Sequence, residues 1–124
     1  MEDFNVQIES TSREISKRER VKIKDTSNAV KIDEATAEGD FVIKPDVYAI
    51  LQIHNAKSKD NPDYRNIVIL DDAGNKFVTG SPSFIKSFID IWNEMEGEED
   101  WEIVCYQRES KNYKGKYFLS CSVL

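Results

Sequence analysis

The sequence has few of the residues that build catalytic and metal sites. Its 124 residues include one histidine, His54, and two cysteines, which leaves no zinc-ligand spacing. The five glycines stand singly, so there is no glycine-rich phosphate-binding loop, and no Gly-x-Ser-x-Gly nucleophile motif occurs. Pro45-Asp46 opens like a metal-dependent nuclease signature, but no acid-x-Lys pair follows it through Thr79. We therefore expect a protein that is not an enzyme and has no catalytic residue, metal or cofactor.

Long hydrophobic runs are also absent. The longest apolar stretches, such as residues 67–70, have the length of a strand and fall far short of a membrane span. The first residues, Met1-Glu2-Asp3-Phe4, are acidic and lack the basic and apolar regions of a signal peptide. Cys105 and Cys121 each alternate with apolar or small residues, which is typical of free thiols buried in strands. These features predict a cytoplasmic protein with no membrane association and no disulfide.

The composition is that of one globular domain spanning residues 1–124, with 40% hydrophobic and 32% charged residues. The net charge of −6 argues against adhesion to nucleic acid by the overall field. However, the two signs of charge are segregated along the chain. Cations gather in residues 12–24 and 106–117, and acids gather in one later segment: Glu94, Glu96, Glu98, Glu99, Asp100 and Glu102. This segregation favours a polarised binding surface.

Alternating or continuous apolar patterns predict a mainly β (α+β) fold. The expected strands cover approximately residues 16–33, 47–54, 66–79, 101–108 and 116–123. Residues 4–12 read as a short strand or an arm, and residues 33–40 and 55–66 read as loops. One amphipathic helix is expected before the last two strands. Ser81 is its N-cap, Pro82 its first residue and Gly97 its C′ residue, and apolar side chains including Trp92 form a buried stripe.

Two segments carry the candidate binding residues. In the first expected strand, Val21 and Ile23 point to one face and four cations point to the other: Arg18, Arg20, Lys22 and Lys24. Such an electropositive strip attracts the phosphates of nucleic acid. The last hairpin combines cations with aromatic rings that can stack on bases: Tyr106, Arg108, Lys111, Tyr113, Lys114, Lys116 and Phe118. Tyr106, Arg108 and Phe118 have the opposite parity to the inward Cys105 and Leu119, which places them on an exposed face.

From Asn66 onward the chain resembles small phage-type single-stranded DNA-binding proteins with an oligonucleotide/oligosaccharide-binding (OB-like) fold. The resemblance lies in the segment Ile67-Val68-Ile69-Leu70-Asp71-Asp72-Ala73-Gly74, in the helix from Ser83 to Met95, and in Ser110-Lys111-Asn112-Tyr113-Lys114-Gly115-Lys116-Tyr117-Phe118-Leu119-Ser120. It implies a five-stranded, partly open barrel in which the loop between the fourth and fifth strands contacts nucleic acid. The implied function is sequence-independent binding of single-stranded DNA, as in phage-type replication or recombination.

Two other interpretations stay open. Lysines on an edge strand also prevent sheets from pairing, so the basic strip of residues 18–24 is equally explained as a solubilising edge. The acidic segment from Glu94 to Glu102 favours a function of another class, a small protein-binding module. Such a module, for example a phage-encoded inhibitor of a host enzyme, would present the acidic surface to a protein partner.

Overall fold

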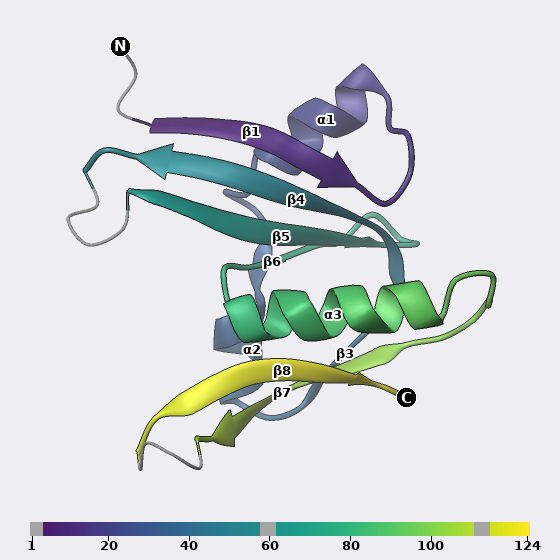
Figure 1. Ribbon diagram of the computed structural model, residues 1–124. Coiled ribbons are helices and arrows are strands. Elements are labelled where there is room, and N and C mark those ends of the chain that lie inside the picture. The colour runs from purple at the N-terminus through teal and green to yellow at the C-terminus, as the bar shows by residue number, and fades with distance from the viewer. Residues whose placement is uncertain (1–3, 58–61, 111–114) are drawn as a thin grey trace.

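The secondary structure is α+β, with 45% of the described residues in strands. The computed structural model describes residues 4–57, 62–110 and 115–124 (Figure 1). In chain order the elements are β1 (Phe4–Thr11), α1 (Lys17–Lys24), β2 (Val30–Lys31), α2 (Ile32–Ala37), β3 (Phe41–Ile43), β4 (Pro45–Asn55), β5 (Asp63–Asp71), β6 (Lys76–Thr79), α3 (Pro82–Glu94), β7 (Ile103–Glu109) and β8 (Tyr117–Val123).

The strands form two open sheets. One has the order β1-β4-β5-β6-β2 and the other the order β3-β7-β8. All neighbouring strands are antiparallel except the short β2, which pairs with β6 in parallel. Helix α3 crosses the space between the two sheets (Figure 1). The described residues therefore form no closed barrel: in place of the expected five-stranded, partly open barrel there are two open sheets.

The chain passes from one sheet to the other at Lys44. β3 ends at Ile43 and pairs with β7, whereas β4 begins at Pro45 and pairs with β5. A register shift between Pro45 and Val47 marks the bend, as is usual where a strand switches sheets. If residues 41–55 count as one bent strand, the spatial order is β7, β3/β4, β5, β6. This is a Greek key, in which the fourth strand returns beside the first.

The expected first strand, residues 16–33, is wrong except at Val30–Lys31, which form β2. Residues 17–24 form helix α1, whose N-cap Ser16 accepts a hydrogen bond from the Glu19 N–H (3.2 Å), while the Glu19 carboxylate accepts one from the Ser16 N–H (3.0 Å). This capping box and the helix-forming Lys, Arg and Glu residues outweigh the alternation. Val21 and Ile23 were expected on one face, but Val21 is 69% exposed and Ile23 is buried.

Helix α1 packs on the five-stranded sheet through one side chain, Ile23, and is hydrogen-bonded to the sheet at its C-terminal end. Ile23 packs in a cluster with Ala49, Leu51 and Ile53 of β4 and with Val68 and Val78. Lys76 of β6 donates hydrogen bonds from its Nζ to the Lys22 carbonyl (2.8 Å) and the Asp25 carbonyl (2.7 Å). These are carbonyls that the last turn of a helix leaves without partners. The sheet is therefore covered on the face opposite α3.

Other boundaries differ less from the sequence prediction. The expected loop 33–40 contains most of α2, and the three-residue β3 was not predicted. The expected strand 66–79 is two strands, β5 and β6, joined by a turn, and β5 starts inside the expected loop 55–66. The strands predicted near 47–54, 101–108 and 116–123 are confirmed as β4, β7 and β8. The segment left open as a strand or an arm is strand β1.

The prediction of α3 is confirmed, with two corrections. The Ser81 hydroxyl accepts from the Phe84 N–H, and Pro82 is the first residue. The helix has its C-cap at Met95, so the C′ residue is Glu96, and Gly97, with φ of +89°, lies one position later than expected. Trp92 is half-buried rather than buried, because it lies at the margin of the core against Tyr48 and Trp101.

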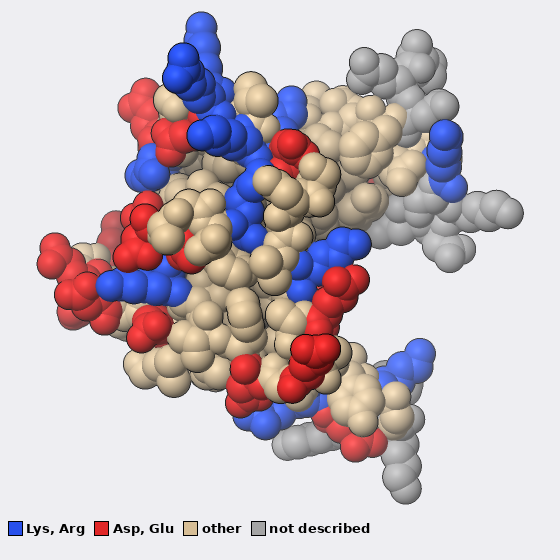
Figure 2. Space-filling view, turned by 180° about the vertical axis from the view of Figure 1, so that it is seen from behind, with Lys and Arg blue, Asp and Glu red and all other residues tan. Residues whose placement is uncertain are grey.

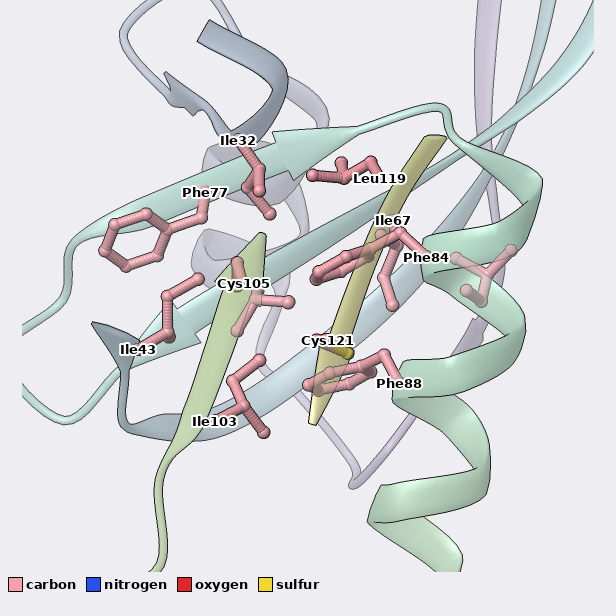
Figure 3. Packing of buried hydrophobic residues seen from close by; sticks show 12 residues of the cluster. Ile32, Ile43, Ile67, Phe77, Phe84, Phe88, Ile103, Cys105, Leu119 and Cys121 are labelled. Carbon is pink, nitrogen blue, oxygen red and sulfur yellow. The ribbon is translucent and has the colours of Figure 1, made fainter. Parts of the chain in front are cut away.

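The main core fills the space between the two sheets (Figure 3). Phe84 and Phe88 of α3 point into it and are fully buried. The cluster draws on elements from both sheets and from α2 and α3: Ile32, Ile43, Ile50, Ile67, Ile69, Phe77, Phe84, Phe88, Ile103, Cys105, Leu119 and Cys121. Because α3 contributes two aromatic rings, it joins the sheets as part of the core.

The two cysteines should be inert towards thiol reagents in the folded protein. Cys105 and Cys121 face each other across β7 and β8 as buried free thiols. Burial raises the pKa of each to about 12, with a smaller contribution to Cys105 from Cys121. The thiolate is the reactive form, so neither side chain is ready to react at neutral pH. We expect no labelling by a disulfide reagent in buffer and labelling of both thiols in denaturant; rapid labelling of the native protein would contradict the described packing.

Candidate nucleic-acid interface

Helix α1 places its cations in two rows. With 3.6 residues per turn, Arg18 and Lys22 share one line along the helix. Lys17, Arg20 and Lys24 share another, which we call the groove row. All five side chains are exposed, and Figure 2 shows Lys and Arg side chains gathered at the end of the molecule where α1 lies. The four predicted cations are thus together, although on a helix, and helical periodicity adds Lys17 to them.

The charge of α1 is not neutralised by its neighbours. The one acid of the helix, Glu19, is held by Ser16 and by Arg13, whose Nη2 lies 3.2 Å from the Glu19 carboxylate. The Ser16 N–H and then the Arg13 side chain lower the pKa of Glu19, despite its partial desolvation. Among the described residues, no acidic side chain forms an ion pair with any of the five cations of α1. They remain available to an anionic ligand.

The second set of predicted residues lies on the outer face of the three-stranded sheet. Cys105 and Leu119 point into the core, so Tyr106, Arg108 and Phe118 point away from it, as expected from their parity. The Arg108 guanidinium carbon lies 4.2 Å from the centre of the Tyr106 ring. Phe118 lies opposite Arg108 in the register and is 42% exposed. We call Tyr106, Arg108 and Phe118 the aromatic sheet face.

The aromatic sheet face is held by its strands rather than by a loop. The Tyr106 hydroxyl lies 3.0 Å from the hydroxyl of Ser122 on β8, which fixes the ring against the sheet. Lys116, immediately before β8, is exposed beside this face. Tyr117, which was not among the predicted site residues, is 66% exposed on the opposite parity. The predicted Lys111, Tyr113 and Lys114 lie outside the described residues.

The structure does not bring the two predicted sets together. α1 packs on the far side of the five-stranded sheet, whereas β7 and β8 belong to the other sheet. In Figure 1 they lie at opposite ends of the molecule, with the larger sheet and α3 between them. A short oligonucleotide therefore cannot contact both. The two predicted sets therefore form two separate candidate surfaces.

The acidic segment forms a third surface at the end of α3. Glu94, Glu96, Glu98, Glu99, Asp100 and Glu102 are all exposed. Asp100 has a φ of +55°, and its carboxylate accepts a hydrogen bond from Lys44 (3.1 Å), which raises the pKa of Lys44. A pocket of about 450 Å³ beside the segment is lined by acids and by Trp92 and Trp101.

Neither a metal-binding cluster nor a membrane-spanning helix occurs in the described part of the chain. Within residues 4–57, 62–110 and 115–124, no group of three or more His, Cys, Asp or Glu side chains is placed to hold a metal ion. His54 instead lies 2.7 Å from Asp63 through its Nδ1. In the same part of the chain, no helix is long and apolar enough to cross a membrane. Comparisons with protein-family models, curated proteins and solved structures find no match.

Proposed function

We propose that this protein binds single-stranded DNA on the aromatic sheet face. The observation that carries the proposal is the arrangement of Arg108 over Tyr106, with exposed Phe118 opposite Arg108. An exposed ring stacks on a base, and a neighbouring guanidinium contributes both stacking and a phosphate contact. Because these side chains stand on paired strands, they are already ordered before the ligand arrives. This reduces the entropy that binding loses.

The arrangement favours a single strand over a duplex. The bases of a duplex stack on one another and leave no faces for Phe118, whereas an unpaired strand exposes them. Arg108 and Lys116 supply nearby positive charge, so part of the affinity comes from the release of counterions. The cations of α1 lie at the other end of the molecule and contact the DNA only if the single strand is long enough to reach that end.

The OB-like assignment is supported by the Greek-key order of β7, β3/β4, β5 and β6 with α3 before the last hairpin. It also has a clear departure. OB-type proteins bind with the face of the second and third barrel strands, which correspond here to β5 and β6. That face is covered, because Val68 and Val78 pack against Ile23 of α1. We therefore place the DNA on β7 and β8.

The test is fluorescence anisotropy with a labelled oligothymidine. We expect binding at low salt, weaker binding as salt rises, and much weaker binding of a duplex of the same length. Unlabelled single strand should compete for the site and unlabelled duplex should not. Absence of binding at low salt with micromolar protein would contradict the proposal. It would favour the protein-binding alternative through the acidic segment, residues 94–102.

A further inference from the structure

A groove of about 480 Å³ runs between helix α1 and strand β1. It is lined by Gln7, Ile8, Lys17, Arg20, Val21 and Lys24. Neighbouring residues of a strand point to opposite faces of the sheet. A groove that touches both Gln7 and Ile8 therefore follows the edge of β1 and does not lie on one face of the sheet.

That edge of β1 is free to accept another strand. β1 is the terminal strand of its sheet and pairs only with β4 among the described residues. Each of its residues is exposed or half-buried. The strand is regular from Phe4 to Ile8, before a register shift between Ile8 and Ser10. An unpaired edge of this kind presents backbone N–H and C=O groups to a partner strand.

The wall of the groove opposite β1 is positively charged and therefore favours an acidic partner strand. This wall consists of the groove row of α1 (Lys17, Arg20 and Lys24) and of Val21, which is 69% exposed. Lys17 and Lys24 are about 10 Å apart along the helix axis, which is about three residues of an extended chain. Carboxylates along one side of an added strand would face these cations, and an apolar residue on that same side would contact Val21 and Ile8.

We infer that this groove binds an acidic, extended peptide segment of a partner protein, which adds to β1 as a further strand. The backbone pairing supplies an attachment without sequence preference, and the groove row supplies the preference for acidic residues. The surface is separate from the aromatic sheet face. A strand added here leaves Tyr106, Arg108 and Phe118 uncovered, so the protein can hold DNA and a partner simultaneously.

The helix offers a matched pair of variants to test this. Arg20→Glu/Lys24→Glu reverses one Arg and one Lys in the groove, and Arg18→Glu/Lys22→Glu makes the same change in the row that does not line it. The probe is a fluorescein-labelled peptide of alternating glutamate and valine. We expect the groove variant to weaken its binding about tenfold or more, through like-charge repulsion, and the control variant to change it much less. Thermal unfolding of both variants verifies that they fold.

A second probe tests the strand pairing directly. Methylation of alternate backbone nitrogens in the same peptide removes hydrogen-bond donors and keeps its charge, so we expect binding to be lost. Equal binding of the methylated peptide would overturn the inference, because strand pairing would then contribute nothing. Equal weakening by both variants would also overturn it, because the cations of α1 would then attract the peptide only through their overall charge or keep the β1 edge from pairing.

Loss of short-oligothymidine binding in the groove variant, with peptide binding intact, would make the groove a nucleic-acid surface instead. Phe118→Ala should leave peptide binding unchanged, which separates this inference from the DNA proposal.

Discussion

Phe88→Ala should lower the free energy of unfolding by about 3–5 kcal/mol, the range for an aromatic side chain removed from a well-packed core. The Phe88 ring is fully buried, and its centre lies 5.5, 6.1 and 5.9 Å from the ring centres of Tyr48, Phe84 and Trp92. These rings connect α3 to β4 across the core. The cavity left by alanine lies between the two sheets, where the surrounding strands cannot collapse fully into it.

Denaturant unfolding followed by circular dichroism measures this loss. Phe118→Ala is the matched control, because it removes the same ring from an exposed position on β8 and should lower stability far less. If the two variants unfold at the same denaturant concentration, Phe88 does not join the sheets as described.

Phe118→Ala should instead weaken the binding of oligothymidine about 5- to 150-fold, which corresponds to the roughly 1–3 kcal/mol of one stacked base. The salt dependence of binding should not change, because a phenyl ring releases no counterions. Arg108→Ala should differ in this respect: affinity falls and the slope of log affinity against log salt flattens by about one unit. Anisotropy titrations at several salt concentrations measure both quantities. Unchanged affinity for Phe118→Ala, with native stability, would remove the aromatic sheet face as the DNA site.

The sequence predicts correctly the helices and strands whose hydrophobic pattern runs over the whole element. Helix α3 has a cap, a proline and thirteen residues of apolar periodicity, and β4 and β8 alternate over a full strand. Helix α1 also left a local signal, since Ser16 and Glu19 have the spacing of a capping box. The alternation of Val21 and Ile23 favours a strand instead, and the prediction followed the alternation. With only eight residues, the two periods cannot be separated by pattern alone.

The remaining features depend on distant parts of the chain. β3 has three residues and exists because β7, far along the sequence, pairs with it. β2 has two residues and is fixed by β6. The distance between the two sets of candidate site residues depends on distant parts of the chain in the same way. The alternation of residues along β7 and β8 places Tyr106, Arg108 and Phe118 on one exposed face. No local sequence pattern indicates how far that face lies from α1. The β1–α1 groove was missed because it requires both the helical phase of α1 and the edge position of β1.

The pairing of β3 with β7 also has a consequence for synthesis of the protein. Ile43 leaves the ribosome about 60 residues before its partner Ile103. At the usual speed of translation this interval lasts roughly 3–12 s. During that time β1, β4, β5 and β6 can already pair, while Phe77, Phe84 and Phe88 still lack the smaller sheet that covers them. The nascent chain should therefore pass through a half-built stage with exposed aromatic side chains, and molecular chaperones that bind apolar segments would meet it at this stage.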